Sequence, residues 1–269
     1  MKLLVYKSLW GMDEGSLEDK FKRIKEAGYD GVETGLPGKK EEKQFKQGLA
    51  KYKLDFIPMI FTEGPDHLAS YRRLVAAAAR WKPRQITAHS GKDFLPYNQQ
   101  AAYFREAVKI GKELRFTVAH ETHRARFLYN AADTARLLKD VPELRINADF
   151  SHWCCVSGSL LQDQEPALRL ACSRASHVHG RVGYEEGPQV PDPRAPEYAR
   201  HLQQHETWWS WIIAEHRKAG KKVLTFTPEF GPPNYMHTLP YTQQPVADLW
   251  DICLWMSGRF RKRFKKEFS

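Results

Sequence analysis

The sequence predicts an α/β protein that folds as a single (β/α)8 TIM barrel over residues 1–269. Three observations lead to this prediction: the chain length, the alternation of strand-like and helix-like segments, and the number of strand-like segments. The chain has 269 residues, close to the ~250 that are typical of such barrels. Alternating strands and helices indicate a parallel sheet, and eight repeats favour closure of that sheet into a barrel.

Eight short segments are apolar or rich in β-branched residues, and each has the length of a buried strand. They are Leu3–Ser8, Gly31–Thr34, Asp55–Phe61, Gln85–His89, Phe116–Glu121, Arg145–Phe150, Ser176–Arg181 and Val223–Phe230. Helical periodicity fills most of the intervals between them, and no linker or low-complexity tract interrupts the pattern. A single domain is therefore expected.

The first interval shows how a helix is bounded in this chain. Ser16 and Asp19 stand at the spacing of a capping box, with Asp in place of the usual Glu or Gln. Gly28 follows the apolar stripe at a position where a left-handed backbone favours glycine. We therefore expect a helix that begins after Ser16 and ends shortly before Gly28.

Two further segments stand out. Residues 182–197 follow the seventh strand-like segment and contain four prolines. Because long loops inside compact domains are usually functional, they are expected to form a lid or a substrate-contact loop, with a passive surface excursion as the alternative. Residues 258–269 form a tail with six basic residues and one acid. This tail is expected to be the frayed, solvated end of the last helix; contact with nucleic acid or an acidic membrane surface is the alternative.

Composition narrows the class of protein. The four cysteines show no CxxC spacing, which favours reduced thiols in a cytoplasmic protein over a disulfide framework or a zinc ribbon. No segment approaches the ~20 apolar residues of a membrane-spanning helix, so no membrane partner is expected. The net charge of +10 lies about half in the basic tail, and the remainder is compatible with a small-molecule enzyme.

Ionisable residues follow the last four strand-like segments at the point where each ends. They are Glu121, Asp149, His179 and Glu229. The C-terminal ends of barrel strands meet at one mouth, so these side chains are expected to converge there. Three carboxylates and one imidazole suit Mn²⁺, Mg²⁺ or Co²⁺ and also accept Zn²⁺. The sequence therefore predicts a site for one divalent metal ion.

Two other histidines accompany this set. His177 lies two residues before His179, so both side chains are expected to point into the barrel. His179 is nearer the mouth and is the preferred ligand, whereas His177 is expected one layer below and is kept as a candidate substrate contact. His89 ends the fourth strand-like segment, where it is either a substrate contact or a structural hydrogen-bonding group.

The predicted site has a defined chemistry. A metal ion that binds a hydroxyl and a neighbouring carbonyl acidifies the carbon between them and stabilises the charge of an enediolate. Carboxylates on opposite faces of the substrate can then remove a proton from one carbon and return it to another.

These residues resemble those of the xylose isomerase-like barrel superfamily of sugar isomerases and epimerases. The resemblance spans nearly the whole chain and is carried by the four-residue set in that strand order, by the Asp149-x-x-His152 spacing, and by the Arg-bearing loop directly after His179. It implies a metal-dependent isomerase or epimerase that acts on a sugar or sugar-derived carbonyl compound through a metal-stabilised enediolate. A small-molecule sugar or polyol derivative is the expected partner, nucleic acid is not, and a homodimer is a further expectation.

The tagatose and psicose epimerases of this superfamily imply individual roles. By resemblance, Glu121 and Glu229 bind the metal and also form the catalytic acid–base pair. His152 falls where those enzymes place a substrate-contacting histidine. Arg181 and Arg124 are then candidate clamps for substrate oxygens or a carboxylate, although Arg181 is nearer to the metal-binding histidine than the arginine of the epimerases.

Three alternatives remain open at this stage. A dehydratase or lyase of the inosose dehydratase type would share the first proton abstraction. An endonuclease IV-like phosphodiesterase would need more histidines than the sequence offers, because the third strand-like segment ends without one and Arg194 stands where another is required. A barrel that binds sugar without catalysis is the third alternative.

Overall fold

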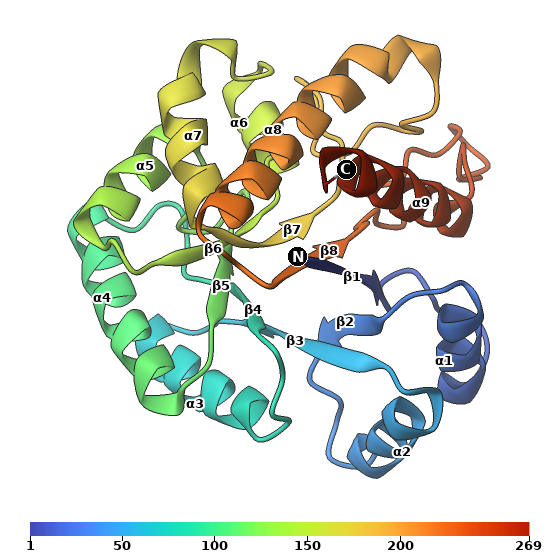
Figure 1. Ribbon diagram of the computed structural model, residues 1–269, viewed down its shortest axis with the longest axis horizontal. Coiled ribbons are helices and arrows are strands. Elements are labelled where there is room, and N and C mark those ends of the chain that lie inside the picture. The colour runs from blue at the N-terminus through green and yellow to red at the C-terminus, as the bar shows by residue number, and fades with distance from the viewer. Residues whose placement is uncertain (269) are drawn as a thin grey trace.

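The computed structural model describes residues 1–268 and has a closed barrel of eight parallel strands at its centre (Figure 1). The strands follow one another in chain order, and β8 pairs with β1 to close the barrel. They are β1 (Lys2–Ser8), β2 (Gly31–Gly35), β3 (Asp55–Phe61), β4 (Ile86–His89), β5 (Val118–Glu121), β6 (Arg145–Ala148), β7 (Ala175–His179) and β8 (Val223–Thr227). The predicted fold is confirmed.

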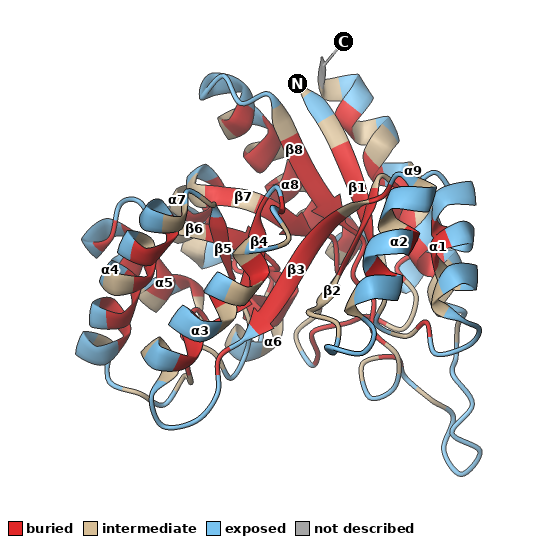
Figure 2. Ribbon diagram, turned by 90° about the horizontal axis from the view of Figure 1, so that it is seen from below, coloured by how far each residue is buried: buried red, intermediate tan, exposed pale blue. Residues whose placement is uncertain are grey.

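Helices form a ring around the strands, with their buried faces turned toward the barrel (Figure 2). They are α1 (Leu17–Glu26), α2 (Glu42–Tyr52), α3 (His67–Ala79), α4 (Tyr97–Leu114), α5 (Ala131–Asp140), α6 (Ser151–Ser157), α7 (Glu165–Arg174), α8 (Ala199–Lys218) and α9 (Leu249–Phe268), with short 3-10 helices at Gln162–Gln164 and Pro196–Tyr198. No helix in residues 1–268 is long and apolar enough to cross a membrane.

Strand side chains alternate between two environments, because successive residues of a strand point to opposite faces of the sheet. Val5, Val32 and Phe226 belong to the large apolar cluster between strands and helices. Leu4 and Tyr6 belong to a separate small cluster, as expected for side chains inside the barrel. The next layers of the barrel interior, toward the strand ends, are polar, which places charged groups directly beneath the mouth.

Helix α1 begins and ends as the sequence predicts. The hydroxyl of Ser16 accepts a hydrogen bond from the backbone N–H of Asp19 at 3.2 Å, and the Asp19 carboxylate accepts one from the backbone N–H of Ser16 at 3.0 Å. Gly28 follows the helix with a φ of +80°, a conformation that costs glycine little. The capping box is therefore complete, although Asp replaces the usual longer acid.

The later strands end earlier than the expected segments. β6, β7 and β8 stop at Ala148, His179 and Thr227, so Asp149, Arg181 and Glu229 lie in the first residues of the following loops. Apolar residues such as Phe150 and Phe230 continue to be buried beyond the last ladder hydrogen bond. The apolar pattern reflects burial and not strand pairing, so the strand ends predicted from the sequence are too late.

The long loop after β7 packs against the barrel, and none of residues 182–197 lies in the lining of the cavity described below. Gln189 exchanges two hydrogen bonds with the backbone of Gly231, at 2.7 and 3.1 Å. The backbone N–H of Gly183 donates to Nε2 of His205 at 3.2 Å. The loop therefore supports the segment that follows β8, and its expected role as a lid or substrate-contact loop stays a prediction.

His205 makes this support sensitive to acid. Burial lowers the pKa of His205 to about 4, and its Nε2 must stay unprotonated to accept the Gly183 N–H. The unfolded chain titrates near 6.5 and binds the proton first, so the stabilisation is present above pH 6.5 and is lost as the pH falls toward 4. Between pH 7 and pH 5 we expect wild type to lose about 2 kcal/mol more unfolding free energy than His205→Gln. Urea unfolding at both pH values measures the difference, and equal losses would contradict it.

The basic tail belongs to the last helix. Residues 258–268 continue α9, with Phe260 and Phe264 buried. Arg259 and Arg263 form ion pairs with Glu206 at 2.7 and 2.9 Å. The described part of the tail therefore differs from the expected frayed end. Phe260 and Phe264 pack into the core, and Arg259 and Arg263 pair with Glu206 on α8. Ser269 lies outside the described residues.

Candidate metal centre

The four predicted ligands meet at the mouth of the barrel. Each offers one oxygen or nitrogen atom, and these four atoms all lie within 4.8 Å of one another. Glu121 and His179 are the last residues of β5 and β7, whereas Asp149 and Glu229 lie just past β6 and β8. All four are buried, so the strand ends bring together three acids and one imidazole in a site shielded from bulk water.

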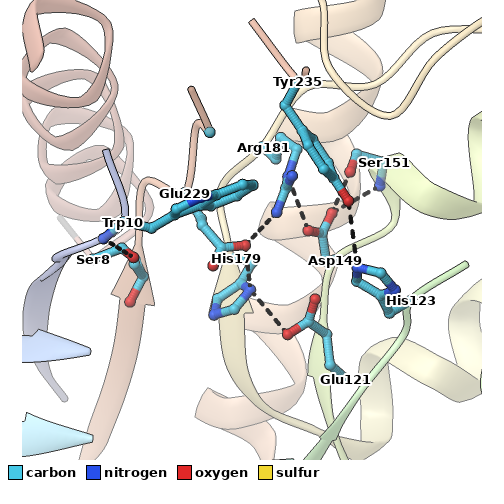
Figure 3. Close-up of polar contacts among 12 residues, drawn as sticks. Ser8, Trp10, Glu121, His123, Asp149, Ser151, His179, Arg181, Glu229 and Tyr235 are labelled. Atoms are coloured by element: carbon cyan, nitrogen blue, oxygen red, sulfur yellow. Dashed lines mark hydrogen bonds and ion pairs between the residues drawn. The ribbon is translucent and has the colours of Figure 1, made fainter. Parts of the chain in front are cut away.

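Two cationic groups bridge the acids (Figure 3). Nδ1 of His179 lies 3.0 Å from a Glu229 oxygen and 3.4 Å from a Glu121 oxygen. Nε of Arg181 lies 3.2 Å from Asp149, and its Nη2 contacts Glu229. The guanidinium thus bridges two of the acids that a metal ion would bind.

The site fits a cation because several of its buried atoms lack hydrogen bonds. Glu121 Oε1, Asp149 Oδ2 and His179 Nδ1 have no hydrogen-bond partner among the described residues. The other Asp149 oxygen accepts hydrogen bonds from the backbone N–H and the hydroxyl of Ser151. The atoms without a hydrogen bond face the centre of the site, where Asp149 Oδ2 and His179 Nδ1 make ion pairs only. Their mixture of carboxylate oxygen and imidazole nitrogen matches a divalent metal ion.

The pKa values show how strongly the acids depend on their neighbours. Burial raises the pKa of Asp149 to about 6, although Arg181 opposes this. Burial also favours the neutral form of Glu121, but His89 and His179 outweigh it and hold the pKa of Glu121 well below its usual range. Asp149 is therefore the acid whose charge is least well compensated by the protein alone.

A buried carboxylate on β2 orients the metal-site histidine. Glu33 accepts hydrogen bonds from the hydroxyls of Thr87 and Thr227, each at 2.5 Å. One of its oxygens lies 3.0 Å from Nε2 of His177 and 3.1 Å from Nε2 of His179. Without a metal ion the His179 ring is protonated and both of its nitrogens face carboxylates. A proton that stays between Nε2 and Glu33 would leave Nδ1 free to bind a metal ion once the second proton is lost, so Nδ1 is the candidate ligand atom.

This contact predicts an effect on metal affinity. Glu33→Gln removes the charge that holds the His179 ring, and second-shell partners of this kind contribute roughly 10- to 100-fold in affinity. We expect a loss of that size when Mn²⁺ binding is measured by calorimetry. Gln100→Met, which removes a hydrogen bond to the backbone carbonyl of Leu95 at the start of α4, is the control. Equal affinity in wild type and Glu33→Gln would contradict this role.

A cavity of about 470 Å³ opens onto the acids. Glu121, Glu229 and Arg181 lie in its lining. Trp10 and Tyr235 form an aromatic wall, with their rings 5.0 Å apart in an edge-to-face contact. The arrangement provides a polar reaction site beside rings that can exclude water.

The structure places two predicted substrate contacts at the cavity. His89 lines it, with Nε2 2.9 Å from Glu121 and its ring stacked on Phe61. Arg181 also lines it, between Asp149 and Glu229 rather than free to act as a separate clamp.

The other three predicted contacts differ. His152 is fully buried with no hydrogen bond to either ring nitrogen, and its Nε2 lies 3.7 Å from Asp149. Arg124 is exposed and lies over the Tyr235 ring, outside the cavity lining. His177 lies one layer below, on Glu33, and also outside the lining. The structure therefore gives no support to His177 as a substrate contact, because its ring is turned into the barrel interior.

Several residues of the site escaped the sequence analysis. They are Trp10, Glu33, His123, Arg126 and Tyr235. Glu33 left a signal, since an acid in the middle of a short buried strand needs a buried partner. Trp10 and Tyr235 left none, because their loops meet only in three dimensions; Trp10 lies so close to Gly231 that any side chain there would collide with its ring.

Known proteins show the same architecture. The family model described as "Xylose isomerase-like TIM barrel" matches residues 21–227. No curated protein matches this chain significantly. A probable 3-DHS dehydratase involved in petrobactin synthesis from Bacillus anthracis is 17% identical with a TM-score of 0.60, over 96% of this chain and 98% of that one.

Two other solved structures are similar in fold. A xylose isomerase-like TIM barrel protein from Mycobacterium smegmatis, in complex with magnesium, is 11% identical with a TM-score of 0.64, over 99% of this chain and 98% of that one. A D-allulose 3-epimerase from a Methylomonas species, in complex with D-allulose, is 14% identical with a TM-score of 0.60, over 97% of each chain. At these identities the structures show the fold alone, whereas the family match covers most of the sequence. This chain therefore belongs to the xylose isomerase-like TIM barrel family.

Proposed function

We propose that the protein is a divalent-metal-dependent isomerase or epimerase that acts on a sugar or sugar-derived carbonyl compound. One observation carries this proposal. Glu121 at the end of β5 and Glu229 just past β8 line the same cavity and reach the same atom of His179, at 3.4 and 3.0 Å. Two carboxylates around one cation site are the arrangement that a proton transfer between neighbouring carbons requires.

Glu121, Asp149, His179 through Nδ1, and Glu229 would hold one Mn²⁺, Mg²⁺, Co²⁺ or Zn²⁺ ion. When bound, the ion would polarise the substrate carbonyl and neutralise the negative charge of the enediolate. The magnesium complex of a family member is compatible with this site.

The chain's own residues would move the proton. Glu229 would take it from the carbon beside the carbonyl, and Glu121 would return one to the neighbouring carbon or to the opposite face. Arg181 would stabilise negative charge at Glu229 and Asp149, and Trp10 and Tyr235 would exclude water from the cavity. A D-allulose 3-epimerase with this fold supports a reaction on a sugar; the cytoplasmic location and a homodimer stay predictions.

A dehydratase shares the first step and differs in the second. After the proton is removed, loss of a hydroxyl group as water gives an unsaturated product, provided that an acid reaches the leaving oxygen. Glu121 and Glu229 line the cavity, and the one that has taken the proton from carbon is the candidate acid that returns it to the leaving oxygen. The dehydratase among the solved structures makes this the first alternative.

An endonuclease IV-like phosphodiesterase would hold more than one metal ion, and one specific observation favours a second site. His89, Glu121 and His123 form another group whose ligand atoms lie within 4.8 Å of one another. A second ion here would share Glu121 with the first. Two ions bridged by one carboxylate are typical of phosphoryl-transfer enzymes.

Metal counting and solvent exchange together test these functions. Purified protein, stripped and then reloaded, would be counted by elemental analysis and incubated in deuterium oxide with ketoses, sugar acids and inososes. One metal per chain and deuterium at a single substrate carbon are expected. An unsaturated product would indicate the dehydratase, and two ions with phosphodiester cleavage the phosphodiesterase. No metal and no exchange, with sugar binding retained, would leave a non-catalytic barrel.

A further inference from the structure

Arg126 is a cationic group of the cavity that the proposed reaction does not use. It lies in the loop between β5 and α5 and lines the same cavity as Glu121 and Glu229. Its Nη1 donates to the carbonyl oxygens of Thr62 and Gly91, at 3.1 and 3.3 Å. Three consecutive loops of the barrel mouth therefore fix the guanidinium in place, which is the preorganisation that a binding group needs.

No acid in the described part of the chain forms an ion pair with this group, although the charge of Glu121 acts on it and opposes the burial that lowers the pKa of Arg126. Among residues 1–268, no carboxylate oxygen lies within 4.0 Å of a nitrogen of Arg126, the distance limit for an ion pair. The acids nearest in sequence to its anchor Thr62 are engaged elsewhere, since Glu63 pairs with Arg73 at 3.6 Å and Asp66 caps helix α3. Neither Nε nor Nη2 of Arg126 donates a hydrogen bond to a described residue. The N–H groups on these two nitrogens are therefore available to a ligand.

Arg126 and Lys92 both act on the nearby ring of His67. Burial lowers the pKa of His67, the charges of Arg126 and Lys92 lower it further, and the charge of Asp66 opposes them. His67 begins α3, whereas Lys92 and Arg126 lie in the loops after β4 and β5. Arg126 itself is half-buried, so its charge is less screened than that of a surface arginine.

We propose that Arg126 binds an anionic group of the substrate, a carboxylate or a phosphate, while the reacting carbonyl lies at the metal centre. The proposal rests on the proposed function only in placing the rest of the substrate at the acids. A planar guanidinium with two unused N–H directions matches a carboxylate or phosphate in a bidentate contact. The substrate would then be a sugar acid or a sugar phosphate rather than a neutral ketose.

The cavity wall beside Arg126 explains how such a substrate would be oriented. Met59 and Phe61 line the cavity, and the Phe61 ring stacks on His89 with the ring centres 4.4 Å apart. This apolar face would pack against the carbon side of a sugar, while the anionic group meets Arg126 and the carbonyl meets the metal centre. A neutral polyol would lose the contact at one end.

Calorimetry with simple probes tests the assignment on the full-length chain, in metal-free and Mg²⁺-loaded form. The probes are inorganic phosphate, D-gluconate and the neutral polyol D-sorbitol, and the variant is Arg126→Gln. A hydrogen-bonded charge contact predicts that the Kd of the preferred anion rises roughly 10- to 100-fold in the variant. Arg105→Gln, which removes an exposed charge on α4, is the matched control and should bind as wild type does. Phosphate and gluconate separate the two anion classes.

Either anion binding more tightly than sorbitol, in an Arg126-dependent manner and in either metal form, supports the proposal. Equal Kd values in wild type and Arg126→Gln in both forms would overturn it, as would anions that bind no better than sorbitol. Arg126→Lys is the control for a loop that no longer folds, because it keeps the positive charge and should keep part of the anion affinity. Full loss in both variants together with a lowered melting temperature would overturn the proposal. A chain that binds no metal would defeat the proposed function but leave the metal-free anion result to stand.

Discussion

Glu229→Gln is expected to lower solvent-deuterium exchange at the substrate carbon by roughly 10³-fold, within the range that general acid–base catalysis contributes. The amide is isosteric with the carboxylate but cannot accept the proton. Its oxygen can still face Nδ1 of His179, which lies 3.0 Å from the Glu229 carboxylate. The barrel should therefore fold normally, and nuclear magnetic resonance of the substrate in deuterium oxide gives the rate.

Two controls separate proton transfer from metal binding in that experiment. Glu113→Gln makes the same charge change on the exposed face of α4 and should exchange at the wild-type rate. The metal content of Glu229→Gln is counted in the same samples, and the rate is compared at full metal occupancy. Wild-type exchange in a fully loaded Glu229→Gln enzyme would remove Glu229 from the proton-transfer role.

The fold and the convergence of the four candidate ligands were accessible from the sequence because both follow from local patterns. Short apolar segments separated by helical periods define the strands, and an ionisable residue at the end of such a segment must lie at the barrel mouth. Glu121 and His179 end their strands, as the pattern predicts. Even where a strand was placed too long, as at Asp149, the side chain stayed at the mouth because the chain leaves the barrel there.

The remaining parts of the site depend on distances that no local pattern contains. Arg181 was predicted as a substrate clamp, but its position between Asp149 and Glu229 follows from the closure of the whole barrel. Arg126 is fixed by carbonyl groups that lie 64 and 35 residues away in the chain. The length of the proline-rich loop after β7 predicts a functional loop, but loop length alone does not say whether such a loop packs against the barrel or covers the site.

Asp149→Asn is expected to weaken metal binding by roughly 10²- to 10³-fold, if each of four ligands supplies about a quarter of a typical 10–16 kcal/mol of metal binding. One Asp149 oxygen is held by the N–H and hydroxyl of Ser151, so the carbonyl of an asparagine would keep that side. Its NH₂ group would then point at the centre of the site and at Nε of Arg181, 3.2 Å from the present oxygen. The variant thus replaces a ligand by a donor that faces another donor.

Titration calorimetry with Mn²⁺ and elemental analysis after dialysis measure that loss. Asp192→Asn is the matched control, because Asp192 pairs with Arg194 in the loop after β7 and lies outside the four-ligand group. It should bind one ion with wild-type affinity. One ion per chain at wild-type affinity in Asp149→Asn would mean that the cation is held elsewhere, and the group formed by His89, Glu121 and His123 would then be the site to remove next. A deficit confined to Asp149→Asn would instead assign the ion to the acids around His179, where the proton-transfer proposal requires it.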